Sequence, residues 1–484
     1  MDARSSLIAR RDALIDGVWV EADSGARFPV QDPATGSVLG EVPDMGAAET
    51  RRAIDAAARA FPLWRATPAK ERAKIMRRWF DLMLADEERL AQIITAEQGK
   101  PLAEARGEIA YAASYIDWFA EEGRRVYGDV LPSAAAGRRQ LVFKQPIGVV
   151  AAITPWNFPS AMFARKVGAA LGAGCTMVLK PAEQTPFSAL ALADLALSAG
   201  VPAGVVNVVT AKNPAPVGLE LTQNPLVRKL SFTGSTEVGR ILLRQAAENV
   251  QKCSMELGGN APLIIFADAD LDLAVAGAIT VKYRNCGQTC ISANRLLVHE
   301  SIVDEFAARL AARASGLKVG EGREEGVALG PLIEEAAVEK CERHVADAVA
   351  RGAKLLTGGA RHERGGTFFQ PTVLAGVAED ALIFHEETFG PIAPIASFRD
   401  EAEALRLANA TPFGLAAYFY SRDLARIFRV AEALDFGMVG VNETLISSEI
   451  APFGGMKHSG LGREGSRYGI DDYLEIKYVC LGGM

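Results

Sequence analysis

The distribution of hydrophobic and polar residues predicts alternating strands and helices through the middle of the chain. Short apolar runs typical of buried strands lie at residues 148–153, 176–179, 205–209, 229–232, 252–255 and 262–266. Segments with helical spacing lie between them, at residues 160–173, 186–199 and 235–248. Strands that alternate with helices are typical of a doubly wound parallel sheet, so we expect an α/β, Rossmann-like fold here.

The flanking regions have different patterns. Residues 47–122 read as a run of helices, and residues 126–146 read as a hairpin that leaves this helical body. A second alternating region, at residues 267–459, is large enough for a second α/β domain. Residues 472–480 alternate apolar and polar positions as an exposed strand does. Such an edge invites pairing with another chain, which favours oligomerisation.

Composition and charge narrow the class of protein. The chain has 484 residues, of which 49% are hydrophobic and 23% charged, so disordered and fibrous classes are excluded. A formal net charge of -7 gives no reason to expect a nucleic acid partner. The longest membrane candidate, residues 167–179, is interrupted by glycines and is shorter than the roughly 20 residues that a spanning helix needs. Charged residues from Asp2 to Asp12 leave no signal peptide, so we expect a cytoplasmic protein that acts on small molecules.

The cysteines are too sparse for a disulfide scaffold. There are six of them, at positions 175, 253, 286, 290, 341 and 480, and we expect free thiols, one of them reactive. The five histidines show no local protease signature, and we assign no residue to a metal.

Two segments carry candidate chemistry. Cys290 ends the loop N-C-G-Q-T-C and is the best candidate nucleophile, although many cysteines are only small buried hydrophobes. A thiolate needs an electropositive, partly exposed place. Glu256, in M-E-L-G-G-N, follows an apolar strand, and a carboxylate that reaches a cleft from there can act as a base. A solvated glutamate fits the same pattern.

No phosphate-binding fingerprint is present in its usual form. The first strand is not followed by G-x-G-x-x-G, and no P-loop occurs. Residues 232–239, F-T-G-S-T-E-V-G, place a small-residue turn at the start of a helix, where free amides attract an anion.

Taken together, these segments resemble the aldehyde dehydrogenase superfamily over nearly the whole chain. The shared motifs are P-W-N-F-P (155–159), K-P-A-E (180–183), F-T-G-S (232–235), E-L-G-G (256–259), G-Q-T-C (287–290), E-T-F-G-P (387–391) and P-F-G-G-M-K-H-S-G (452–460). Because they occur in the family's order, a chance match is negligible.

The resemblance implies three parts. These are an NAD-binding domain at residues 1–123 and 147–258, a catalytic α/β domain at residues 259–458, and a small β oligomerisation domain at residues 124–146 and 469–484. It also implies a homo-oligomer, either a dimer or a tetramer.

The resemblance also implies catalytic roles. Cys290 is similar to the nucleophile that attacks an aldehyde, giving a thiohemiacetal and then a thioester. Glu256 resembles the base that activates Cys290, the hydrolytic water, or both. The side-chain amide of Asn157 and the backbone N–H of Cys290 would form the oxyanion hole.

A cofactor site follows in the same way. The implied contacts are Lys180 and Glu183 to the adenosine ribose, Trp156, Gly234 and Ser235 on the pyrophosphate side, and Glu387 with Phe389 at the nicotinamide ribose. Glu183 would accept hydrogen bonds from a free 2′-hydroxyl and repel a 2′-phosphate. NAD is therefore favoured, and NADP is possible.

Within the superfamily, the chain is most similar to the succinate-semialdehyde dehydrogenases. The evidence is Arg165 in A-M-F-A-R-K, Arg284 six residues before Cys290, L-I-S-S at residues 445–448, and the tail at residues 460–480. A distal carboxylate needs permanently charged, bidentate donors, which arginine provides. The alternative is that either arginine is a structural ion-pair partner. Ser447 would add a hydroxyl, and whether Ser447 or Ser448 faces the substrate stays open.

Other functions fit the same motifs. Glutarate semialdehyde is one methylene longer, and a methylene is worth only about 1 to 3 kcal/mol in an apolar pocket. A catalytically silent binding protein of this fold and a cofactor-free cysteine hydrolase are the alternatives from other classes. Some relatives have a second cysteine two positions after the nucleophile, and Ser292 stands there, so we expect no redox switch of that kind. Whether Cys286 can reach Cys290 stays open.

Overall fold

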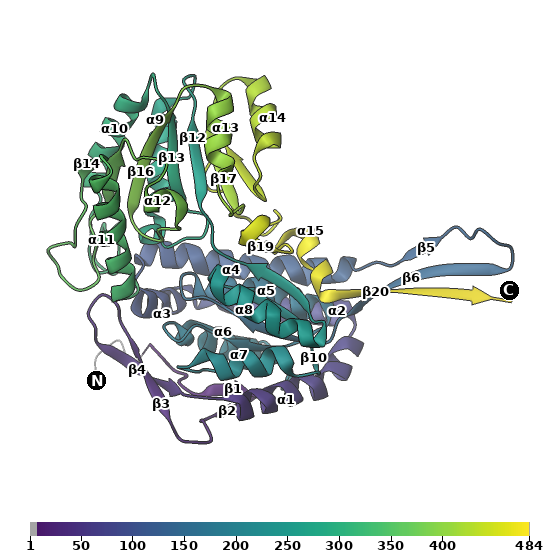
Figure 1. Cartoon of the computed structure of the whole chain (residues 1–484). Coiled ribbons are helices and arrows are strands. Elements are labelled where there is room, and N and C mark those ends of the chain that lie inside the picture. Colours follow the sequence, from purple (N-terminus) through teal and green to yellow (C-terminus); the bar gives the residue numbers. More distant parts are fainter. Residues whose placement is uncertain (1–6, 484) are drawn as a thin grey trace.

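The strands predicted between residues 148 and 256 form the centre of one eight-stranded sheet (Figure 1). The structure, a computed structural model, describes residues 7–483, so Asp2 of the N-terminal segment lies outside the described residues. The sheet order is β19-β11-β10-β7-β8-β9-β1-β2. The central strands are parallel: β7 (Val149–Ile153), β8 (Thr176–Lys180), β9 (Val206–Val208), β10 (Val227–Thr233) and β11 (Lys252–Glu256). Short antiparallel strands complete the ends: β19 (Gly460–Leu461), β1 (Ala13–Ile15) and β2 (Val18–Val20).

Helices cover both faces of this sheet because successive strand residues point to opposite sides. Val150 and Ala152 of β7 pack into one core, whereas Val149 and Ala151 pack into another. The first core includes residues of α2 (Ala69–Ala85), α3 (Glu87–Gln98), α4 (Leu102–Glu122), α5 (Pro159–Ala173) and α6 (Pro186–Ser198). The second includes residues of α1 (Ala47–Ala66), α7 (Pro214–Gln223) and α8 (Thr236–Ala246). This two-sided cover is the doubly wound arrangement predicted from the sequence.

A second sheet, above the first in Figure 1, has seven strands in the order β14-β15-β16-β13-β12-β17-β18. Its strands are β12 (Ala261–Ile265), β13 (Ala293–His299), β14 (Lys354–Thr357), β15 (Thr372–Ala375), β16 (Ile392–Phe398), β17 (Ala416–Tyr420) and β18 (Met438–Val441). All neighbours are parallel except β14 and β15. Its helices are α9 (Leu271–Tyr283), α10 (Val303–Ser315), α11 (Glu335–Ala350), α12 (Leu382–His385), α13 (Glu401–Asn409) and α14 (Leu424–Ala433).

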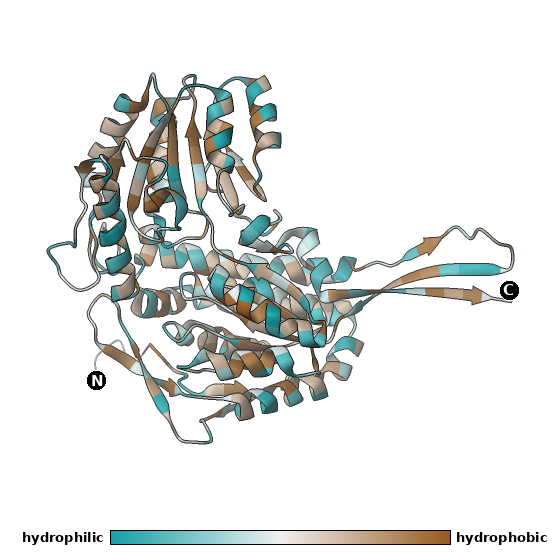
Figure 2. Cartoon of the chain, viewed as in Figure 1, coloured by the Kyte–Doolittle hydropathy of each residue, from teal (hydrophilic) through white to brown (hydrophobic). Residues whose placement is uncertain are grey.

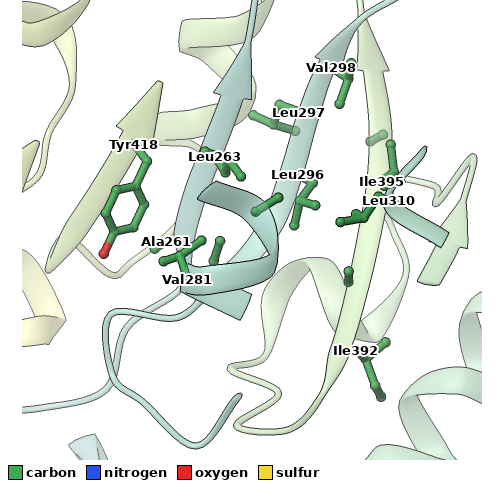
Figure 3. Packing of buried hydrophobic residues seen from close by; sticks show 14 of the residues in the cluster. Ala261, Leu263, Val281, Leu296, Leu297, Val298, Leu310, Ile392, Ile395 and Tyr418 are labelled. Carbon is green, nitrogen blue, oxygen red and sulfur yellow. The ribbon is translucent and has the colours of Figure 1, made fainter. Parts of the chain in front are cut away.

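The core of the second sheet is built mainly from apolar side chains. Figure 3 shows Leu263, Leu296 and Ile395, from three neighbouring strands, in one cluster with Leu310 of α10, and all four are buried. Burying a side chain of this size is worth about 1.5 to 3 kcal/mol. The strands that carry the loop around Cys290 are therefore held on a rigid support.

Three strands form an arm that projects from the body (Figure 1). They are β5 (Asp129–Leu131), β6 (Arg138–Pro146) and β20 (Leu474–Gly482), in the order β20-β6-β5, and they are antiparallel. Figure 2 shows hydrophobic residues along these strands, and Val130 and Ile476 are 76% and 72% exposed. The hairpin and the tail predicted from sequence therefore pair with each other.

The predicted α/β class and the alternation of strands and helices are confirmed. The pattern does not predict α7, because its first turn contains Pro214 and Pro216, although Asn213 caps it by accepting the N–H of Ala215 at 3.2 Å. It also gives no sign of β1, β2, or the pair β3 (Arg27–Gln31) and β4 (Val38–Pro43), since strands this short show too little alternation. A last short helix, α15 (Ser466–Gly469), precedes β20. Within residues 7–483, no helix is long and apolar enough to cross a membrane.

Candidate active site

The carboxyl ends of the parallel strands of the first sheet bring several sequence motifs to one edge. Trp156 follows β7, Lys180 ends β8, Ser235 follows β10 and Glu256 ends β11. Later strands are added on both sides of β7, so the strand order reverses between β7 and β10. A crevice outside the strand ends at such a switch point is where open α/β sheets bind dinucleotides.

The residues predicted to bind the cofactor fit that use. Lys180 is buried, and its Nζ lies 3.0 Å from Oε2 of Glu183, whose side chain is partly exposed. Gly234 precedes Ser235, whose hydroxyl accepts the N–H of Val238 at 3.3 Å and thereby caps α8. A helix start of this kind presents unpaired backbone N–H groups to an anion.

The two residues predicted at the nicotinamide end lie in the second sheet's part of the chain, between α12 and β16. Oε1 of Glu387 accepts the N–H of Gly259 at 2.9 Å, and burial raises the pKa of the Glu387 carboxyl to about 7. The rings of Phe389 and Trp156 meet edge to face with centroids 5.6 Å apart. Phe389 has φ +55, the left-handed region that non-glycine residues seldom adopt outside constrained sites.

One cavity of about 360 Å³ joins the candidate nucleophile to all three predicted substrate residues. Cys290, Arg165, Arg284 and Ser447 all line it. Its other walls are largely apolar, with Met162, Phe158, Ile291 and Phe453 among them. A larger cavity of about 640 Å³ lies beside the β3–β4 loop. Glu183 is in its wall and Cys290 is not. The smaller cavity is the candidate site because it holds the reactive groups.

Arg165, on α5, is buried and well supported. Its guanidinium carbon lies 3.8 Å from the ring centroid of Phe453 and 5.3 Å from that of Tyr115. Its Nε lies 3.6 Å from Oε2 of Glu464. Neither Nε nor Nη2 has a hydrogen-bond partner among the described residues. Arg165 is therefore an ion-pair partner and still has donors to offer to a ligand.

Arg284 is held more loosely. Its guanidinium carbon lies 5.2 Å from the ring centroid of Phe158. Within residues 7–483 its side chain forms no hydrogen bond and no ion pair closer than 4.0 Å, and its charge lowers the pKa of Glu104, another residue of the cavity wall. Arg284 therefore differs from Arg165, which has a carboxylate oxygen within 4.0 Å of its guanidinium.

The contacts of Ser447 and Ser448 show which of the two serines faces the cavity. Ser447 lines the cavity, whereas the hydroxyl of Ser448 donates to Oε2 of Glu449 at 3.2 Å. The carbonyl of Ser448 also accepts the hydroxyl of Tyr115 at 3.3 Å. Ser447 is therefore the serine that faces the cavity.

The pKa of the Cys290 thiol is raised. Burial raises its pKa to about 12, and the carboxylates of Glu387 and Glu256 add to that shift. The electropositive environment expected for a reactive cysteine is therefore absent, because carboxylates outweigh the nearby Arg165. The next residue, Ile291, is fixed by a bond of 2.9 Å from the hydroxyl of Tyr418, a core residue of β17 (Figure 3). A thiol so placed needs a base.

Glu256 is a buried carboxyl with no partner. It is 3% exposed, and neither of its oxygens has a hydrogen-bond partner in the described part of the chain. Burial raises its pKa, and the like charge of Glu464 raises it further. Glu464 itself is held as the anion, because Lys166 contacts it at 2.6 Å and lowers its pKa. Buried polar groups are nearly always bonded, so an unpartnered carboxyl here is typical of a functional group.

Asn157 lies at the junction of the two α/β parts. Its Nδ2 donates to the carbonyl of Gln288 at 3.1 Å. Its own carbonyl accepts from Nζ of Lys100 at 2.8 Å and from Nδ2 of Asn285 at 3.0 Å. Lys100 is in turn paired with Glu108 at 2.5 Å in the buried interior.

Sequence reasoning does not single out Lys100, Glu104, Glu108 or Asn285, although they contact or flank the site. The only signal for Asn285 is its place within N-C-G-Q-T-C. All six cysteines have free thiols, so Cys286 and Cys290 are not joined. Among the described residues, no group of three or more His, Cys, Asp or Glu is arranged to hold a metal ion.

Comparison with known proteins agrees with this geometry. Residues 19–479 match the aldehyde dehydrogenase family. The chain is 62% identical over 482 residues to succinate-semialdehyde dehydrogenase [NADP(+)] GabD of Escherichia coli, and 60% identical over 484 residues to a glutarate-semialdehyde dehydrogenase of Pseudomonas aeruginosa, with 100% of each chain covered. The crystal structure of succinate-semialdehyde dehydrogenase from Burkholderia pseudomallei superimposes with a TM-score of 0.97 at 64% identity, covering 99% of this chain and 98% of that one. The chain belongs to the aldehyde dehydrogenase family.

Proposed function

We propose that this enzyme oxidises succinate semialdehyde to succinate with NAD(P) as the hydride acceptor. The observation that carries the proposal is that Arg165, Arg284 and Ser447 line the same cavity as Cys290. Two guanidinium groups and a hydroxyl suit a carboxylate, and the thiol suits an aldehyde. A short substrate with a carboxylate at one end and an aldehyde at the other would engage both.

In the first step, Sγ of Cys290 attacks the aldehyde carbon and Glu256 takes the thiol proton. The C–S bond forms as the carbonyl π pair moves to oxygen, giving a thiohemiacetal oxyanion. Asn157 Nδ2 and the backbone N–H of Cys290 stabilise that oxyanion. Such donors are worth roughly 100- to 1,000-fold in rate each. Glu256 must be ionised to act, and its raised pKa therefore places the rising limb of activity at higher pH than a surface glutamate would give.

The second half-reaction releases the acid. When bound, the nicotinamide supplies the hydride acceptor, and the Cys290 adduct becomes a thioester. Glu256 first releases the thiol proton to solvent and then removes a proton from water, whose oxygen attacks the thioester carbon. The C–S bond breaks, the thiol regains a proton, and succinate leaves. One water is consumed and two protons are released for each hydride transferred, one that came from the thiol and one from the new carboxylic acid.

For the cofactor, we propose a preference for NAD over NADP. Lys180 and Glu183 would hold the adenosine ribose, Gly234 and Ser235 with Trp156 the pyrophosphate side, and Glu387 with Phe389 the nicotinamide ribose. The carboxylate of Glu183, with its side chain partly exposed beside Lys180, supports the preference because it would repel a 2′-phosphate. The coarser requirement for NAD(P) follows from family membership.

For the assembly, we propose a homo-oligomer, a dimer or a tetramer, in which the arm meets a second copy. We propose three domains in each chain. Residues 1–123 and 147–258 form the NAD-binding domain, residues 259–458 the catalytic domain, and residues 124–146 with 469–484 the oligomerisation domain. The exposed apolar residues Val130 and Ile476 support this role of the arm. Light scattering should give a molar mass that is a multiple of 51.5 kDa, and replacing Ile476 by a charged residue should reduce this mass. A monomeric wild-type chain would refute the assembly.

The six free thiols fit a reducing compartment, and we propose the cytoplasm.

A substrate panel tests the function. kcat/KM is measured for succinate, glutarate and malonate semialdehydes and for butyraldehyde, each with NAD and with NADP. We expect succinate semialdehyde with NAD to be the best pair. A higher value for glutarate semialdehyde would reassign the substrate. No NADH from any aldehyde would indicate a silent binding protein, and acid formation without cofactor would indicate a hydrolase.

A further inference from the structure

Asn285 has an unusual backbone conformation next to the candidate nucleophile. It lies in the short 3-10 segment Arg284–Gly287 with φ 50 and ψ 36, and Cys286 follows with φ 57 and ψ 30. Two successive non-glycine residues in the left-handed region are costly, and asparagine tolerates this region better than most residues. The N–H of Asn285 is held by Oε2 of Glu104 at 2.8 Å. The surrounding structure thus enforces this conformation.

The side-chain amide of Asn285 forms three hydrogen bonds with residues around the site. Its Nδ2 donates to the carbonyls of Asn157, at 3.0 Å, and of Gln288, at 3.2 Å. Its Oδ1 accepts from Nε2 of Gln98 at 3.0 Å. Asn285 is 1% exposed, so water does not compete for these bonds.

Neighbouring bonds dictate which way this amide points. Oε1 of Gln98 accepts the N–H of Lys100 at 3.0 Å, so the Nε2 end of Gln98 must face Asn285. Two carbonyl oxygens on the other side can accept only from an N–H donor. The Nδ2 of Asn285 therefore faces Asn157 and Gln288.

We propose that Asn285 is a positioning residue that holds the two halves of the oxyanion hole together. One half is Nδ2 of Asn157, two residues before α5, and the other is the N–H of Cys290, two residues after Gln288. Asn285 lies 128 residues after Asn157 in the sequence, and its side-chain amide joins the segment of Asn157 to the segment that carries Cys290. Asn157 and Gln288 are also joined directly at 3.1 Å, which closes a ring of bonds. This inference rests on the oxyanion role given to Asn157 in the proposed function.

The substitution Asn285→Gly tests the role with little backbone disturbance. Glycine adopts the left-handed conformation readily, so the change removes the amide and keeps the turn. Asn285→Asp keeps the shape but turns a carboxylate oxygen toward two carbonyls, and should be at least as harmful. A displacement of the reacting groups by 1 Å can cost about 100-fold, so we expect NADH formation in a single turnover to slow by roughly 10- to 100-fold in Asn285→Gly. KM for the aldehyde and the affinity for NAD should stay near the wild-type values.

Asn207 offers a matched control. It is a fully buried asparagine whose Nδ2 donates to the carbonyls of Met177 and Gly204 and whose Oδ1 accepts the N–H of Asp16, so its bonds have the same pattern. It lines neither the candidate cavity nor the strand ends around it. Asn207→Ala should lower the melting temperature without slowing the single turnover.

A double-mutant cycle with Asn157→Ala decides the mechanism. If Asn285 acts through Asn157, then Asn285→Gly should slow the Asn157→Ala enzyme by no more than about twofold, which is the scatter of independent sites. Full additivity of the two losses, or a single-turnover rate in Asn285→Gly equal to wild type, would overturn the positioning role. If Asn157→Ala itself left the rate unchanged, the oxyanion assignment of the proposed function would be wrong and the positioning role would fall with it. The cycle is run with the best aldehyde of the panel, so a wrong substrate does not obscure it.

Discussion

Arg284→Ala isolates recognition of the substrate carboxylate from the chemistry at Cys290. Arg284 lines the cavity and forms no hydrogen bond to the described residues, and its only ring contact is with Phe158 at 5.2 Å. Truncating it therefore breaks no internal bond. The half-buried guanidinium is available to a ligand, so its loss should lower kcat/KM for a substrate that carries an anionic group.

The size of the effect follows from the bonds that are lost. Hydrogen bonds to charged groups contribute about 1.5 to 3 kcal/mol each. That free energy corresponds to roughly 10- to 150-fold in kcat/KM for succinate semialdehyde. Butyraldehyde has the same chain length and no carboxylate, so its kcat/KM should be unchanged or higher. Arg284→Lys should fall between the wild type and Arg284→Ala, because lysine keeps the charge and loses the bidentate geometry.

The assay is the initial rate of NADH formation over a range of concentrations of each aldehyde, at saturating NAD. The melting temperature of each variant, which should stay at the wild-type value, serves as the control for folding. Equal losses for succinate semialdehyde and butyraldehyde would refute the reasoning. Arg284 would then support the loop that carries Cys290, and the substrate would revert to an unspecified aldehyde.

Three further predictions concern the nucleophile, the base and the cofactor. Alkylation of Cys290 by iodoacetamide should rise about tenfold for each pH unit through pH 9, because only the thiolate reacts and its pKa is raised to about 12. A rate that levels off below pH 9, in a reaction absent from Cys290→Ala, would mean a lower pKa. Glu256→Gln should slow both the first turnover of NADH and the hydrolysis of the thioester, because Glu256 takes a proton in each step. The rising limb of kcat against pH should vanish, and an unchanged pH profile would count against the general-base role. Glu183→Ala should raise the ratio of kcat/KM with NADP to that with NAD, whereas a wild-type preference for NADP would show that Glu183 turns away from the ribose.

The sequence predicts the parallel sheets well because their strands are nearly continuous apolar runs. Residues 148–153 and 176–179, for example, become β7 and β8 with little change of boundary. Short antiparallel strands such as β1 carry no comparable signal. The start of α7 does carry one, the cap Asn213 followed by Pro214, but the prolines mask the helical spacing after it.

Some features of the candidate site can likewise be predicted from the sequence and others cannot. Motifs within one segment, such as the cysteine loop and E-L-G-G, are readable because each residue type implies its own chemistry. What the motifs cannot give is the sum of interactions between segments. The raised pKa of Cys290 depends on Glu387, almost a hundred residues away, and the bonds of Asn285 depend on Gln98 and Asn157. These relations exist only once the two sheets are packed together.

The two arginines of the cavity are therefore not equivalent. Burial raises the pKa of Cys290 and of Glu256, and the charge of Arg165 opposes both shifts, whereas Arg284 is among the causes of neither. Arg165 also pairs with Glu464 at 3.6 Å, so in the proposed mechanism it would link the carboxylate-binding end of the cavity to the groups that move protons. A substrate carboxylate bound to Arg165 would offset part of its positive charge and so raise the pKa of Glu256 further. Binding of the same carboxylate by Arg284 would reduce this effect. Arg165→Ala should accordingly slow butyraldehyde as well as succinate semialdehyde and shift the pH profile to higher pH. Arg284→Ala should do neither, and a common response of both variants to butyraldehyde would contradict this division of roles.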